Sequence, residues 1–182
     1  MADRVNVIGD AAIEVIAAEG MRGLTHRAVD REAGLPVGST SYYARTRAAL
    51  LELAIARIIE LDSVDAEPPP GGLAESMAGY VHEAITTGRT RMLARYEFAL
   101  EATRRPELRR VYDEGGLSIR RRAAEVLAAR GSPEPERHAT VVVNWMEGTI
   151  FDALAGTGSL APPGPAALRS SAREVLAGIG VA

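Results

Sequence analysis

Cysteine and lysine are absent from this chain, and aromatic residues are scarce. Among 182 residues there is no cysteine, all 21 basic residues are arginine, and 4% are aromatic. The lack of cysteine excludes disulfide bonds and thiolate metal sites, and the lack of lysine excludes a Walker-type phosphate loop. No apolar run is long enough to span a membrane, and the first predicted helix, residues 5–18, lacks the basic lead of a signal peptide. We therefore expect a cytoplasmic protein without a membrane partner.

Patterns of catalytic residues are also missing. The three histidines, His26, His82 and His138, lie far apart in the sequence, and none has a second ligand at the spacing of a metal site. No serine lies in the strand-turn-helix pattern of a hydrolase nucleophile. We therefore predict that the chain is not an enzyme, with no catalytic residues, no metal and no cofactor.

The most informative segment, residues 22–47, has the pattern of a helix-turn-helix. Thr25 can cap a helix, because its hydroxyl can accept backbone N–H groups of the first turn. Gly34 provides the left-handed conformation that ends that helix, and Pro36 suits the start of a second, short helix over about 37–43. Thr46 can cap a third helix.

Charge and hydroxyl groups make this segment a candidate DNA-binding surface. It holds five arginines against one aspartate and one glutamate, a net charge of +3, so the remainder of this −3 chain carries −6. The second helix is rich in hydroxyls, which we expect to be exposed and to bond phosphates or base edges. A structural hairpin with a solvated arginine face gives a similar pattern. The turn glycine, the hydroxyls and the flanking arginines together favour DNA binding.

These residues resemble the tetracycline-repressor (TetR) family of bacterial one-component transcription regulators. The resemblance covers residues 5–55 and is carried by Gly20 and by residues 23–25, 31–35, 38–43 and 45–51. It implies that Thr25, Tyr42 and Arg47 contact phosphates and that residues 37–43 enter the major groove. The family often has tyrosine where Ser41 stands and an aromatic residue where Ala44 stands, so a phosphate contact is expected to have moved to Tyr42 or Tyr43. The full predicted set of DNA contacts is Thr25, His26, Arg27, Val37, Gly38, Ser39, Thr40, Ser41, Tyr42, Tyr43, Arg45 and Arg47.

The remaining sequence predicts a larger helical body. Apolar residues recur at helical spacing over residues 47–64, 73–87, 89–104, 106–130, 134–156 and 166–178, with breaks rich in Gly and Pro between several of them. No alternating strand pattern appears. We predict an all-α fold with two domains: an N-terminal three-helix helix-turn-helix domain over residues 1–47, and a helical ligand-binding and dimerisation domain over residues 48–182.

Two surfaces of this body are candidates for binding. His82, Met92, Tyr96 and Trp145 could line an apolar pocket for a small-molecule effector, although bulky residues of this kind are also ordinary core residues. The last two helices are apolar enough to pack against a partner, and in the TetR family the equivalent pair makes a homodimer. A dimer is also expected because one short recognition helix gives too little contact for specific binding.

The sequence therefore predicts a ligand-responsive transcription regulator. In this interpretation a homodimer binds a palindromic operator in double-stranded DNA as a repressor, and a small molecule releases it. A ligand-dependent activator fits the same pattern. A helical adaptor that binds only proteins and uses the helix-turn-helix as a scaffold is the alternative of a different class, and steeply salt-dependent duplex binding would distinguish it.

Overall fold

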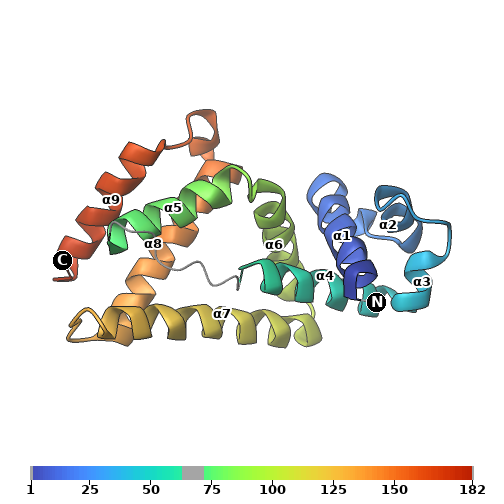
Figure 1. The fold of residues 1–182 in the computed structure, drawn as a ribbon, viewed down its shortest axis with the longest axis horizontal. Helices are drawn as coiled ribbons and strands as arrows, with labels where there is room; N and C mark the ends of the chain where they lie inside the picture. The colour runs from blue at the N-terminus through green and yellow to red at the C-terminus, as the bar shows by residue number, and fades with distance from the viewer. Residues whose placement is uncertain (1, 63–71, 182) are drawn as a thin grey trace. The chain divides into compact units, whose positions relative to one another are not determined.

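The computed structural model describes residues 2–62 and 72–181, and within these ranges it is entirely helical (Figure 1). The elements are α1 (Ala2–Gly23), α2 (His26–Glu32), α3 (Ser39–Tyr43), α4 (Arg47–Asp62), α5 (Leu73–Ile85), α6 (Arg89–Ala102), α7 (Pro106–Ala128), α8 (Pro135–Ala155), the 3-10 helix η1 (Thr157–Leu160) and α9 (Pro165–Gly178). The predicted all-α fold is confirmed. The predicted break between the helices expected over residues 47–64 and 73–87 lies almost wholly outside the described residues.

The described helices form two compact units. The first contains the described residues up to 62 together with residues 90–110, and the second contains residues 72–89 and 111–181. The first unit therefore groups α4 and most of α6 with the N-terminal helices. The predicted division of the chain into residues 1–47 and 48–182 stays a prediction.

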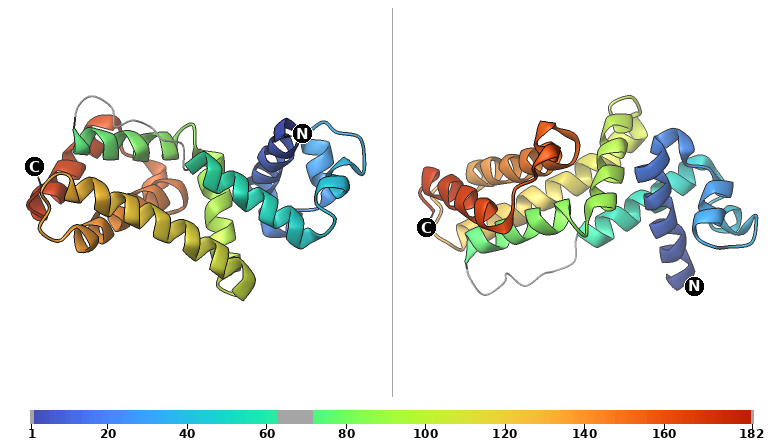
Figure 2. Two further views of the ribbon diagram at one scale, coloured as in Figure 1. Left: turned by 60° about the horizontal axis from the view of Figure 1, so that its bottom comes forward. Right: turned by 90° about the horizontal axis from the view of Figure 1, so that it is seen from above.

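In the first unit, α1 packs against α4 and α2 (Figure 2). Ile8, Ala12 and Ile16 of α1 form a buried apolar stripe, because residues three to four apart share one face of a helix. Gly9 lies so close to α4 that a Cβ on it would meet the Cβ of Arg57 at 2.8 Å. Near its end α1 is interrupted at Gly20, whose φ of 69° is a left-handed conformation that favours glycine.

In the second unit, α5 packs against α8 and α9 (Figure 1). The core cluster includes Met77 of α5, Leu127 of α7, Val142 of α8 and Leu176 of α9. No described helix is long and apolar enough to cross a membrane.

This core corrects one expectation about the last two helices. The apolar residues of α8 and α9 that made these helices candidates for partner packing are mostly buried within the protomer, namely Ala139, Val142, Val143, Ile150, Leu168, Ala172 and Leu176. They are buried because α5 packs on both helices. These residues are therefore not available for contact with a second copy.

Candidate nucleic-acid interface

The helix-turn-helix forms with the predicted caps and turn. Thr25 has extended backbone angles, and its hydroxyl accepts the Ala28 N–H at 3.1 Å, which caps α2. Gly34 has a φ of 63°, and the Leu35 N–H donates to the carbonyl of Asp30 at 2.8 Å, so the chain turns sharply there. The hydroxyl of Thr46 accepts the Ala49 N–H at 3.1 Å at the start of α4. These three predictions are confirmed.

The recognition helix α3 presents large side chains to solvent. Val37, just before it, is 83% exposed, Tyr42 is 80% exposed and Tyr43 is 36% exposed. The two tyrosine rings stand edge to face with their centroids 5.1 Å apart. Ser41 is also exposed on α3, whereas Ser39 is half-buried with its hydroxyl bonded to the Pro36 carbonyl.

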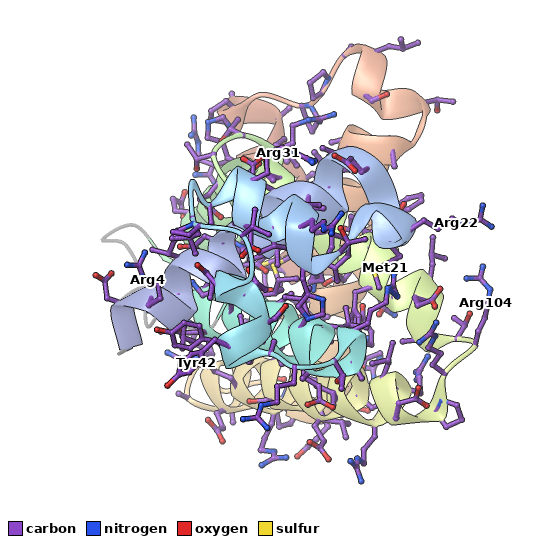
Figure 3. All side chains as sticks on the ribbon, turned by 90° about the vertical axis from the view of Figure 1, so that its right-hand side faces the viewer. Arg4, Met21, Arg22, Arg31, Tyr42 and Arg104 are labelled. Atoms are coloured by element: carbon purple, nitrogen blue, oxygen red, sulfur yellow. The ribbon has the colours of Figure 1, made fainter. Side chains whose placement is uncertain are left out.

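Exposed arginines lie on the same unit as this helix. Arg22, Arg27, Arg31 and Arg45 are all exposed, and Arg31 makes a long contact of 3.5 Å with Glu19. Figure 3, which faces this end of the first unit, shows Arg4, Arg22, Arg31 and Tyr42. Arg4, which is exposed near the start of α1, lies outside the predicted set of DNA contacts.

Thr40 corrects the expectation that the hydroxyls of α3 are exposed. Its side chain is fully buried, and its hydroxyl donates to Oδ1 of Asp30 at 2.6 Å. Asp30 itself is 1% exposed, although a charged side chain is ordinarily found on the surface. The reason is that α2 and α3 cross at this point, so a carboxylate on one helix meets the start of the other.

Asp30 also binds the backbone at the start of α3. Oδ2 accepts the Gly38 N–H at 2.7 Å, and Oδ1 accepts the Thr40 N–H at 2.8 Å. Burial raises the pKa of Asp30, but these hydrogen bonds and the one from the Thr40 hydroxyl outweigh it, so the pKa lies below its usual value of 3.8. The carboxylate is therefore charged at neutral pH without facing the solvent.

Two other predicted DNA contacts have partners within the protein. Nε2 of His26 lies 2.6 Å from the carbonyl oxygen of Ala44, the residue that follows α3. Arg47 remains exposed, and one of its guanidinium nitrogens donates to the carbonyl of Met21 near the end of α1. The guanidinium group has five N–H donors, so this bond leaves others for a phosphate.

The four candidate ligand-binding residues are divided between the two units. Met92 is fully buried and Tyr96 is half-buried on α6 in the first unit, where the Arg95 guanidinium lies 5.4 Å from the centre of the Tyr96 ring. His82 on α5 and Trp145 on α8 are half-buried in the second unit, where Trp145 Nε1 donates to the Ser171 hydroxyl at 2.9 Å. A pocket formed by these residues stays a prediction.

The structure also contains a groove, which does not involve the four candidate ligand-binding residues. In the second unit, α7 and α8 border an open groove of about 440 Å³ whose lining includes Leu117, Ala124 and Thr140 but none of the four candidates. Among the described residues, no three histidine or carboxylate side chains are arranged to hold a metal ion.

A helix-turn-helix followed by a larger helical body is the architecture that the sequence predicted for a transcription regulator. A family model described as "Tetracyclin repressor-like, C-terminal domain" matches residues 68–180, which is more than half of the chain. The chain therefore belongs to the TetR family of transcriptional regulators. No curated protein matches it.

Solved structures of the same fold cover nearly the whole chain. A transcriptional regulator from Rhodococcus sp. Rha1 is 23% identical with a TM-score of 0.79, and the match covers 98% of each chain. A TetR-family member from Streptomyces coelicolor A3 is 28% identical with a TM-score of 0.73, over 94% of this chain and 97% of that one. The multidrug binding protein EbrR, complexed with ethidium, is 30% identical with a TM-score of 0.66, over 94% of this chain and 98% of its own.

Proposed function

We propose that this TetR-family chain is a ligand-responsive repressor that binds a palindromic operator in double-stranded DNA as a homodimer. The observation that carries the proposal is the exposed recognition helix, with Tyr42 and the preceding Val37 at least 80% exposed, on a unit that also carries exposed arginines. Hydroxyl, guanidinium and apolar groups of this kind match phosphates and base edges. The predicted contacts that are exposed in the protomer are Thr25, Arg27, Val37, Gly38, Ser41, Tyr42, Tyr43, Arg45 and Arg47.

Arginine variants test this interface. Replacing Arg45 or Arg47 with alanine should weaken binding to every duplex and lower the slope of log K against log salt by about 1 for each phosphate that is no longer neutralised. Arg137→Ala is the matched control, because this arginine is exposed on α8 and pairs with Glu134 in the other unit. An unchanged salt slope in both Arg45→Ala and Arg47→Ala would show that these arginines do not bind phosphates.

The dimer is proposed to form through the outer faces of α8 and α9. On α8, Val141 is 38% exposed and Phe151 is 49% exposed, with the exposed Gly148 between them in sequence. The exposed face of α9 combines the charged Arg173 and Glu174 with small residues, namely Ala166, Ala167, Ser170, Ala177 and Gly178. A two-fold dimer through these faces would place two recognition helices about 34 Å apart.

A pair of charge substitutions tests the dimer surface. Phe151→Glu should make the protein monomeric in sedimentation and lower operator affinity more than tenfold, because one recognition helix then binds alone. Leu117→Glu on α7 is the control, since Leu117 is 59% exposed and lies outside this face. A Phe151→Glu protein that remains dimeric would contradict this choice of surface.

The effector is proposed to be a small organic molecule. The support comes from EbrR, a multidrug binding protein solved with ethidium and with proflavin, which are flat aromatic cations. Trp145 is the chain's only tryptophan, so its fluorescence reports on one site. Saturable quenching by ethidium that is lost in Tyr96→Ala would support the predicted ligand-binding set. Quenching that rises linearly without saturation would contradict it.

Release from DNA requires that effector binding and DNA binding are coupled through the protein. A hundredfold loss of operator affinity requires about 2.7 kcal/mol of coupling free energy between effector and DNA. A reporter gene under the selected operator should be silenced by the protein and restored by the effector. A reporter that needs the protein for its expression would indicate an activator.

A further inference from the structure

The recognition helix α3 is too short to be stable through its own residues alone. It has five residues, fewer than an isolated helix needs for stability in water. Its N-cap position is Gly38, which has a φ of 94° and no side chain to accept the free N–H groups of the first turn. Some other group must therefore bind the start of this helix.

Asp30 of α2 supplies the missing cap across the turn. Its two carboxylate oxygens accept the N–H groups of Gly38 and Thr40 at 2.7 and 2.8 Å, and Oδ1 also accepts the Thr40 hydroxyl at 2.6 Å. Asp30 and Thr40 are 1% and 0% exposed. A negative charge is favourable at this end of a helix, because the free N–H groups of the first turn carry partial positive charge.

His26 binds the opposite end of α3. It precedes Asp30 by one turn on α2, and its Nε2 lies 2.6 Å from the carbonyl oxygen of Ala44, which is fully buried just after α3. A carbonyl oxygen only accepts hydrogen bonds, so Nε2 must carry the proton. The two side chains, on one face of α2, thus bind both ends of the recognition helix.

We infer that His26 and Asp30 are positioning residues that determine operator specificity by fixing both ends of α3, and that His26 is not a DNA contact. The inference rests on the proposed function, because it assumes that α3 reads bases. Phosphate binding depends instead on arginines such as Arg27 and Arg45, which lie outside α3. Releasing α3 should therefore lower affinity for the operator while leaving binding to unrelated duplexes nearly unchanged.

A matched pair of substitutions at His26 tests the specificity. His26→Gln keeps an amide N–H that can donate to Ala44, whereas His26→Leu has no donor. Operator affinity should fall at least tenfold in His26→Leu and stay within threefold of wild type in His26→Gln. Affinity for an unrelated duplex and the salt slope should not change in either variant.

Three results would overturn the inference, and each has a different meaning. Equal losses on both duplexes together with a lower salt slope would mean that His26 binds a phosphate directly. Unchanged operator affinity in His26→Leu would mean that this bond does not position α3. Wild-type protein that binds no duplex selectively would overturn the proposed function, and the role in specificity with it.

Amide hydrogen exchange tests the two contacts without DNA. In Asp30→Asn the amide group would turn a donor toward one of the two N–H groups that the carboxylate accepts, so at least one of the Gly38 and Thr40 amides should exchange at least tenfold faster. The amide of Ala54, buried in the middle of α4, should exchange at the wild-type rate and shows that the unit remains folded. Unchanged exchange at Gly38 and Thr40 would refute the positioning role of Asp30, whatever the DNA measurements give.

Discussion

The buried hydroxyl of Thr40 gives the sharpest test of how the helix-turn-helix is held together. Thr40→Val replaces the hydroxyl by a methyl group of similar size, so it removes the bond to Asp30 without opening a cavity. That bond is 2.6 Å long, and both residues are almost fully buried. A hydrogen bond to a charged group contributes about 1.5–3 kcal/mol, so we expect the free energy of unfolding to fall by about 2 kcal/mol.

Urea and thermal unfolding of matched variants measure this loss. For a chain of this length, about 2 kcal/mol corresponds to a fall in Tm of about 4–8 °C. Ser41→Ala is the control, because Ser41 is the next residue on α3, carries the same functional group and is exposed. Its free energy of unfolding should stay within about 0.5 kcal/mol of wild type.

The comparison of Thr40→Val with Ser41→Ala also defines the results that would refute the assignment of the Thr40 hydroxyl to Asp30. If Thr40→Val keeps wild-type stability but changes which operator bases are preferred, then the Thr40 hydroxyl faces DNA, and the assignment to Asp30 is wrong. If both variants lose stability equally, the loss comes from the helix as a whole and not from the buried bond.

Three further predictions concern other contacts. Because the pKa of Asp30 is lowered below 3.8, its stabilising contribution should be complete above that pH and lost as the pH falls through the lower folded-state value; Asp30→Asn should remove this part of the acid-unfolding curve. Arg57 binds both carboxylate oxygens of Asp10 at 2.7 and 3.3 Å at a partly exposed site, where the Arg57 side chain is 18% and the Asp10 side chain 50% exposed. A double-mutant cycle in urea should give a coupling of about 0.5–1 kcal/mol, and a value near zero would contradict a stabilising pair. Ser132→Ala should lower the free energy of unfolding by about 1–2 kcal/mol, because the buried Ser132 hydroxyl forms a hydrogen bond with Nδ1 of His138 at 2.7 Å. An unchanged urea midpoint would show that this nitrogen finds another partner in the variant.

The features that the sequence predicted correctly depend on neighbouring residues. Thr25 and Thr46 cap helices through the N–H group three residues further on, and Gly34 ends α2 through its own backbone angles. Such signals are contained in one turn of chain, so residue type and spacing are enough to read them. The helices of the body were predicted for the same reason, because their apolar residues recur at helical spacing.

The features that the sequence did not predict depend on how helices cross. Thr40 and Asp30 are ten residues apart, and only the crossing of α2 and α3 brings them together. A threonine in a hydroxyl-rich helix gives no local sign that it alone is buried. The signal that could have helped is Gly38, a helix start without its own cap, with a carboxylate eight residues earlier.

The last two helices show a related difficulty. Val142 and Leu176 are as apolar as a partner-facing residue would be, yet they lie in the protomer's own core. A helix with apolar residues on two sides, such as α8 with buried Val142 and exposed Phe151, has two faces that could pack in either direction. Residue type alone does not decide which face meets α5 and which meets another copy.

Selection of bound duplexes from a random DNA library, with purified protein at near-physiological salt, tests the central claim most directly. A dimer with two exposed recognition helices should recover a palindromic consensus with half-sites about one helical turn apart. The His26→Leu protein should recover a weaker consensus from the same library. Recovery of sequences no different from the unselected library, with and without candidate effectors, would contradict the claim that this helix-turn-helix reads DNA.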